Sequence, residues 1–149
     1  MLATIPSDHL TREIIAAAIE VHRVLGPGLL ESAYSKCLEL ELSARKLAFA
    51  TERQIPLVYK GVTLDCKYRL DLVVEATVVV EVKAATDILP VHQAQLLTYL
   101  KLTGFPVGLM INFNVDQLVK GVKRVINPRP DAEKANALLA VNQSVARGA

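Results

Sequence analysis

Three charged side chains interrupt a strongly β-forming stretch, and their spacing could support chemistry. Asp71 lies in the run that begins at Tyr68, and Glu81 lies in the valine-rich run that ends at Lys83. Valines flank Glu81 on both sides, a pattern typical of a central strand that is covered on both faces. Residues two apart share a strand face, so Glu81 and Lys83 point the same way. An ionised glutamate in such a strand needs a partner.

The length of the turn between the two runs decides whether Asp71 joins this pair. A three-residue loop, Glu75–Thr77, places Asp71 opposite Glu81 and gathers all three charges on one face. A two-residue loop would pair Asp71 with Val82 and scatter them. We predict the three-residue loop. Two opposed carboxylates repel one another unless a cation lies between them, and carboxylate oxygens suit Mg²⁺ or Mn²⁺.

The chemistry that such a group could perform is phosphodiester hydrolysis. A lysine beside a divalent cation can stabilise the negative charge that develops in phosphoryl transfer, or orient or deprotonate the attacking water. The alternative is an ordinary ion pair between Glu81 and Lys83 on a solvated sheet face, because opposite charges often pair on sheets. The apolar neighbours of Glu81 and the opposed Asp71 favour the functional interpretation.

Length and composition limit the kinds of protein that the chain can be. Its 149 residues fit one domain with a substantial core, and the 52% of hydrophobic residues argues against disorder. No apolar run reaches the roughly 18 residues of a membrane span, and the N-terminus lacks a signal-peptide pattern, so we expect a cytoplasmic protein. Cys37 and Cys66 are not spaced like metal ligands, so we expect both to be reduced, structural thiols and we expect no zinc site.

The net charge of +2 is too small to indicate nucleic acid by itself. The basic excess lies in the second part of the chain, from residue 53 onward. Lys120, Lys123, Arg124 and Arg129 could contact phosphates there, although scattered surface cations of this kind are usually only solvated.

Hydrophobic periodicity and turn residues predict the elements that position these side chains. Ser7 can cap a helix that runs to about Leu25, with His22 as a core or boundary histidine. Strand, helix and strand over 78–113 predict a right-handed parallel crossover. The remaining predicted elements are a helix over about 29–46, hairpins over 55–64 and 68–83, a helix over about 91–103, a strand over 107–113, a helical turn over 116–120, an extended piece over 121–126, and a loose helix over 131–141 followed by a frayed end over 143–149.

Further polar side chains on two of these helices could serve the same site. Gln95 and Tyr99 share one face of the crossover helix, and they could orient water or hold a phosphate if that face looks toward the carboxylates. Glu31 lies near the first turn of the second helix and shares a face with Tyr34. A glutamate there is often only a favourable charge at the positive end of the helix dipole.

The order of these motifs resembles that of the GxxExxY proteins of the PD-(D/E)XK nuclease superfamily. The resemblance covers about residues 8–127, and it implies an α/β, restriction-endonuclease-like fold, in which helices flank a central mixed sheet within a single domain over 1–149. The matching motifs are Gly28-Leu-Leu-Glu31-Ser-Ala-Tyr34, Tyr68-Arg-Leu-Asp71, Val80-Glu81-Val-Lys83, Gln95-Leu-Leu-Thr-Tyr99 and Gly108-Leu-Met-Ile-Asn-Phe113.

The resemblance implies a metal site and its ligands. Asp71 and Glu81 would bind the metal, and the backbone carbonyl of Val82 would be a further ligand. Glu31 would be the helix glutamate that approaches the metal site in many members, as a further ligand or a water-orienting base. Leu70, rather than proline, precedes Asp71, a departure that is common in the superfamily.

The resemblance also implies roles for the remaining motif residues. Lys83 would stabilise the transition state or activate water. Gln95 and Tyr99 resemble the Gln-x-x-x-Tyr motif of RecB-like exonucleases, in which the pair supports the metal site and the substrate phosphate.

We therefore predict an enzyme, a Mg²⁺- or Mn²⁺-dependent nuclease that acts on DNA more than on RNA. The alternative is a catalytically silent nuclease-fold module that binds nucleic acid or a protein partner. The lack of an obvious basic groove and the scarcity of aromatic residues, with no Trp and three Phe, favour that alternative. A third possibility is a subunit that works only as a homodimer or with a partner.

Overall fold

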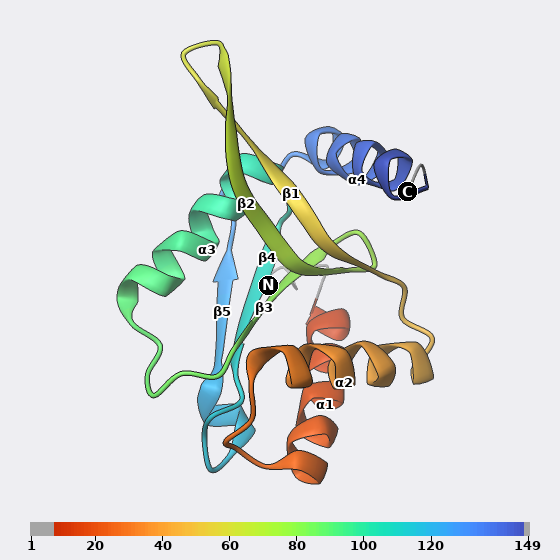
Figure 1. Ribbon diagram of the computed structural model, residues 1–149, viewed down its shortest axis with the longest axis vertical. Helices are drawn as coiled ribbons and strands as arrows, with labels where there is room; N and C mark the ends of the chain where they lie inside the picture. Colours follow the sequence, from red (N-terminus) through yellow and green to blue (C-terminus); the bar gives the residue numbers. More distant parts are fainter. Residues whose placement is uncertain (1–7, 148–149) are drawn as a thin grey trace, which may run out of the picture.

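A computed structural model describes residues 8–147, apart from the side chains of residues 66, 67 and 141–147; the predicted cap Ser7 lies outside this range. Five strands form one mixed sheet in the order β1-β2-β3-β4-β5, and only β3 and β4 are parallel (Figure 1). The elements are α1 (Asp8–Leu25), α2 (Glu31–Ala44), β1 (Phe49–Tyr59), β2 (Val62–Val74), β3 (Val78–Lys83), α3 (Pro90–Thr103), β4 (Val107–Asn112), the 3₁₀ turn η1 (Leu118–Gly121), β5 (Val122–Ile126) and α4 (Ala132–Arg147).

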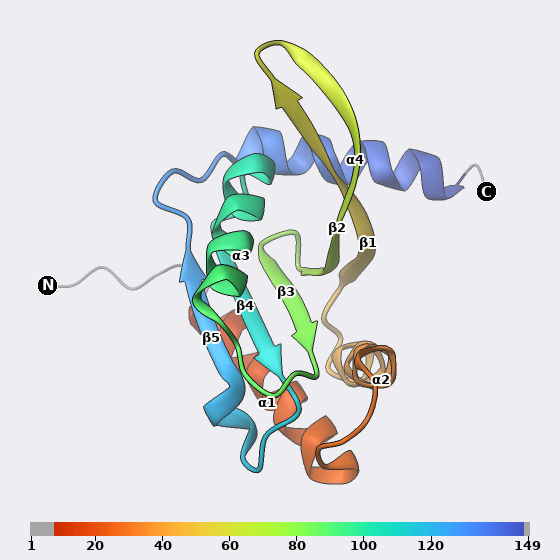
Figure 2. The same cartoon turned by 60° about the vertical axis from the view of Figure 1, so that its left-hand side comes forward.

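Helices cover both faces of the sheet, which confirms the predicted α/β, restriction-endonuclease-like fold. Val80 and Leu109 belong to a core cluster with α1 and α2, whereas Val79 and Met110 belong to a second cluster with α3 and α4. Figure 2 shows where these helices lie around the sheet. Because neighbouring residues of a strand point to opposite faces, the consecutive valines at 78–80 of β3 supply both cores. The predicted covering of this strand on both faces is confirmed.

The turn between β2 and β3 has the predicted three residues. Leu72 lies opposite Val80 and Val74 lies opposite Val78, so Asp71 and Glu81 are the next two residues beyond the last backbone pair. Glu75 at the turn adopts a φ of 51°, and hydrogen bonds in both directions tie it to residue 48, which precedes β1. These bonds hold the turn against the start of β1.

The hairpins at 55–64 and 68–83 are longer than predicted and share one strand. β1 begins at Phe49, and β2 runs without interruption from Val62 to Val74, so residues 49–51, 53 and 54 pair with residues 72–74, 70 and 69. The long β1–β2 hairpin extends beyond the rest of the sheet (Figures 1 and 2). The prediction was too short because residues 51–54 are mainly polar, as suits an edge strand.

The helices begin or end within a few residues of the predictions, except at the C-terminal end. α2 begins at Glu31 and ends at Ala44, and α3 begins at Pro90, which suits the first turn of a helix. The predicted parallel pairing of the strands on either side of α3 is confirmed. The expected fraying over 143–149 was wrong as far as Arg147, because α4 continues to that residue.

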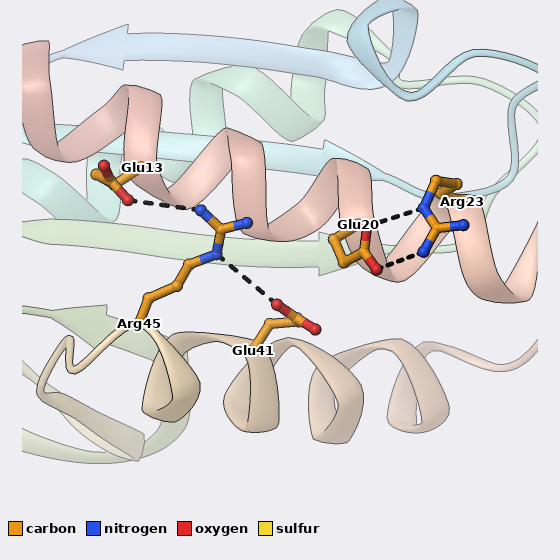
Figure 3. A network of polar contacts seen from close by, with 5 residues as sticks. All are labelled: Glu13, Glu20, Arg23, Glu41 and Arg45. Atoms are coloured by element: carbon orange, nitrogen blue, oxygen red, sulfur yellow. Dashed lines mark hydrogen bonds and ion pairs between the residues drawn. The ribbon is translucent and has the colours of Figure 1, made fainter.

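Side chains between α1 and α2 join the two helices on their outer side. Arg45, at the C-terminal end of α2, lies 3.6 Å from a Glu13 carboxylate oxygen of α1 and 3.7 Å from Glu41 of α2 (Figure 3). Glu20 and Arg23 form a second ion pair along α1. All these groups are partly exposed, so their contribution to stability is small.

Tyr34 fixes the start of α2 from inside the core. Its hydroxyl donates to the Gly26 carbonyl at 2.6 Å and accepts from the Leu29 N–H at 3.1 Å, while its ring stacks on Phe113 with centroids 4.5 Å apart. His22 donates from Nε2 to a carbonyl 2.8 Å away and is buried, which confirms its predicted structural role. The glycine-rich loop before α2 is therefore held at both ends.

Candidate active site

The candidate site lies where β2 and β3 separate. Backbone pairing of the two strands ends at Leu72 and Val80, and beyond it each strand bonds to a side chain of the other. The Asp71 N–H donates to Oε1 of Glu81 at 3.3 Å, and the Val82 N–H donates to Oδ2 of Asp71 at 2.9 Å. This reciprocal arrangement holds the two carboxylates in the gap between the strands, one facing the other.

The acidic pair is largely buried, and its two carboxylates repel one another. Glu81 is only 8% exposed, and Asp71 is half-buried. Burial raises the pKa of Glu81 to about 8, and the negative charge of Asp71 adds to that shift. Without a cation, the Glu81 carboxyl is therefore mostly protonated at neutral pH, since two such charges are costly to hold together in a recess.

Lys83 and the Val82 backbone border the same gap. The Lys83 ammonium lowers the pKa of Glu81, although less strongly than burial raises it, so the two groups interact electrostatically. On the side of β4, the Lys83 carbonyl accepts a hydrogen bond of 2.9 Å from the N–H of Phe113. Because alternate residues of a strand direct their backbone groups toward opposite neighbours, the carbonyl of Val82, like its N–H, is directed toward β2 and Asp71.

Helix α3 brings Tyr99 to the acidic pair. Burial raises the pKa of the Tyr99 phenol, and the negative charges of Glu81 and Asp71 act in the same direction. Gln95 lies one turn earlier on α3 and is exposed, and no hydrogen bond ties its side chain to the acidic pair. His92 accepts from the Leu89 N–H at 3.0 Å and so caps the start of this helix.

Glu31 lies on a different helix from Tyr99 and Gln95. It is exposed at the start of α2, and α2 packs on the opposite sheet face from α3. Within the described residues, histidine, cysteine, aspartate and glutamate side chains form no group of three or more suited to a metal ion. The carboxylates that the structure brings together are Asp71 and Glu81.

Two of the four predicted phosphate contacts are engaged in ion pairs. Arg124 pairs with Asp8 at the start of α1, and Lys120 pairs with Asp116 one turn away. Cys37 is a free thiol, and the side chain of Cys66 lies outside the described residues. Among residues 8–147, none of the helices is long and apolar enough to cross a bilayer.

Sequence reasoning missed two residues that border the site. The Tyr68 ring contacts the Tyr99 ring, with centroids 5.9 Å apart. Asn112, at the end of β4, donates to the Ala85 carbonyl at 2.9 Å and accepts from the Ala85 N–H at 3.0 Å, which fixes the loop after Lys83. The available signals were an aromatic residue three positions before Asp71 and a polar residue that ends an apolar strand.

Comparisons with known proteins assign the chain to a superfamily. The crystal structure of a protein called SSO0001 is 18% identical to the chain, covers 91% of it and 74% of its own length, and has a TM-score of 0.47. No curated protein matches the chain. Residues 8–125 match the family description of the PD-(D/E)XK nuclease superfamily, and they include every residue that borders the gap between β2 and β3. The chain belongs to the PD-(D/E)XK nuclease superfamily.

Proposed function

We propose that the protein is a divalent-metal-dependent nuclease that hydrolyses phosphodiester bonds, in DNA more than in RNA, and that it is a cytoplasmic, single-domain member of the GxxExxY group with RecB-like motifs. The observation that carries this proposal is the reciprocal bonding of Asp71 and Glu81 across the separated strands, with Lys83 two residues farther along β3. Superfamily membership supports it independently.

The chemistry of the donor set fits a hard divalent cation. Mg²⁺ is usually bound through one or two carboxylates and keeps several waters, so Asp71 and Glu81 with the Val82 carbonyl are a sufficient set. The raised pKa of Glu81 points the same way, because a cation would relieve the repulsion from Asp71 and favour the ionised carboxylate. Glu31 would contribute through a water or as an additional ligand.

Lys83, Tyr99 and Gln95 would assist the metal-bound carboxylates in catalysis. A divalent cation, when bound, would polarise a phosphoryl oxygen and lower the pKa of an attacking water. The Lys83 ammonium would stabilise the negative charge that develops on the phosphoryl oxygens, or orient the attacking water. Tyr99 would donate its phenolic proton in a hydrogen bond to a substrate phosphate oxygen, and Gln95 would support it from the preceding turn.

The test is a survey of cleavage with a matched lysine control. Labelled single- and double-stranded DNA and RNA would be incubated with Mg²⁺ or Mn²⁺ and with wild-type protein, Lys83→Ala or Lys134→Ala, all purified identically. Lys134 is an exposed lysine of α4 with the same charge. We expect cleavage by wild type and Lys134→Ala and none by Lys83→Ala.

Two other outcomes would refute the proposal. Equal cleavage by all three proteins would indicate a contaminating nuclease. Binding of nucleic acid without cleavage under any condition would favour the catalytically silent module. If cleavage appears only above a protein concentration at which the protein self-associates, the enzyme works as a homodimer.

A further inference from the structure

The two exposed tyrosines of the chain both lie on the β1–β2 hairpin. The chain has four tyrosines, of which Tyr34 is buried and Tyr99 is half-buried. Tyr59 is 62% exposed at the far end of the hairpin, and Tyr68 is 43% exposed near its middle. Tyr68 is therefore the exposed aromatic residue nearest in sequence to the acidic pair, three positions before Asp71.

Tyr68 lies just past the point where β3 leaves β2. Within the described chain, β3 pairs with β2 only over residues 72–74, so the next part of β2 has no neighbouring strand on that side. On its other side β2 pairs with β1, where Tyr68 lies opposite Ile55. Ile55 is buried in the cluster under α3 and α4. The Tyr68 ring contacts the Tyr99 ring, with an angle of 53° between the two ring planes. Burial raises the pKa of the Tyr99 phenol, and the negative charges of Glu81 and Asp71 raise it further.

An aromatic ring in this position can bind a nucleobase. Base–aromatic stacking needs one open face of the ring and tolerates any base, because every base has a π-face. Bases in a duplex are already stacked on one another, whereas the bases of a single strand or a frayed end are free to stack on protein. Glu81 is only 8% exposed, and a flexible single strand can adapt to a carboxylate that is so deeply placed more readily than a rigid duplex can.

We propose that Tyr68 stacks on a nucleobase next to the scissile phosphate and thereby makes the site selective for single-stranded nucleic acid. This inference rests on the proposed nuclease function and names the substrate class of the same site. The opposing explanation is that Tyr68 only supports the Tyr99 ring by packing.

Binding and kinetics together distinguish these explanations. The variants are Tyr68→Phe, Tyr68→Leu and Tyr68→Ala, with Tyr59→Ala as the control on the far end of the hairpin. Anisotropy would measure binding of a labelled deoxythymidine oligonucleotide and of the matching dA·dT duplex, with Ca²⁺ in place of Mg²⁺ so that cleavage does not intervene. Steady-state cleavage with Mg²⁺ would then separate KM from kcat.

The stacking proposal predicts a specific pattern across these variants. Tyr68→Ala should weaken binding of the single strand by about tenfold or more, in line with the effect of removing a base-stacking aromatic residue. Tyr68→Phe should bind like wild type, Tyr68→Leu should bind like Tyr68→Ala, and binding of the duplex should hardly change. In cleavage of the single strand, the loss should appear in KM rather than in kcat.

Contrary results would identify which proposal fails. If Tyr68→Leu matches wild type, or if the loss appears in kcat alone, Tyr68 supports Tyr99 and the stacking proposal is wrong. If wild type cleaves duplex at least as well as single strand and Tyr68→Ala affects both equally, the nuclease proposal stands and single-strand selectivity is refuted. If single-strand binding depends on Tyr68 but no substrate is cut, the stacking proposal stands and the nuclease proposal fails.

Discussion

Replacing Glu81 by glutamine should change how the stability of the metal-free protein depends on pH. Burial, reinforced by Asp71, raises the pKa of Glu81 from 4.5 to about 8 in the folded protein. Between these values the folded state holds a proton that the unfolded state has released, so wild-type stability falls as pH rises. Above about pH 8 both states have released it, and the loss is complete.

The size of the effect follows from the width of this interval. One pKa unit corresponds to about 1.4 kcal/mol, so the roughly two units between about pH 5 and pH 7 correspond to up to about 3 kcal/mol. Relaxation of water and of Asp71 around the charge would reduce this, and we expect a loss of about 1–3 kcal/mol. Glu81→Gln keeps an acceptor for the Asp71 N–H but cannot ionise, so it should not show the loss.

Urea unfolding in EDTA, followed by circular dichroism because the chain has no Trp, would measure both proteins across this pH range. Glu133→Gln, an exposed glutamate of α4, is the matched control and should follow the wild-type profile. Parallel profiles for wild type and Glu81→Gln would refute the reasoning, because they would mean that Glu81 is not held in a recess against Asp71.

Three further predictions concern the elements that hold the site in place, and urea unfolding measures each of them. Tyr34→Phe should cost about 1–3 kcal/mol because the loop before α2 loses its donor and acceptor, and an unchanged stability would exclude that role. Asn112→Ala should cost about 2 kcal/mol and speed amide hydrogen exchange in the loop after β3, whereas unchanged exchange would contradict the anchoring. Gly104→Ala should cost at least about 1 kcal/mol more than Gly28→Ala, because both have positive φ but only the Cβ at Gly104 would collide with a backbone carbonyl; equal costs would rule out the collision.

The register of the acidic pair could be predicted because local and global patterns agree there. The valines of β3 fix its position at the centre of the sheet, and the alternation of side chains then leaves the length of one loop as the main unknown. The loop has the predicted three residues, and Asp71 and Glu81 are brought into contact directly beyond the last backbone pair. What the sequence did not predict is that the strands separate at this pair and exchange side-chain for backbone hydrogen bonds.

Other features depend on long-range packing that a sequence pattern does not encode. Residues 51–54 of β1 are mainly polar because an edge strand exposes much of its surface, so periodicity placed the start of this strand too late, at Ile55. The motif around Glu31 was easy to find, but the buried member of that motif, Tyr34, serves the fold through Phe113 and the loop before α2. Tyr68 gave no periodic signal, because its contact with Tyr99 joins β2 to a helix that follows much later in the chain.

The most direct test of the central claim is the metal dependence of cleavage by wild type, Asp71→Asn and Asp87→Asn on the substrate that the survey identifies. Asp87 is an exposed aspartate in the loop before α3 and controls for the loss of one negative charge. We predict that wild type and Asp87→Asn reach the same plateau rate as Mn²⁺ increases, whereas Asp71→Asn shows no metal-dependent cleavage. The same rate and the same Mn²⁺ dependence in Asp71→Asn would contradict the claim that the acidic pair between β2 and β3 forms the catalytic metal site.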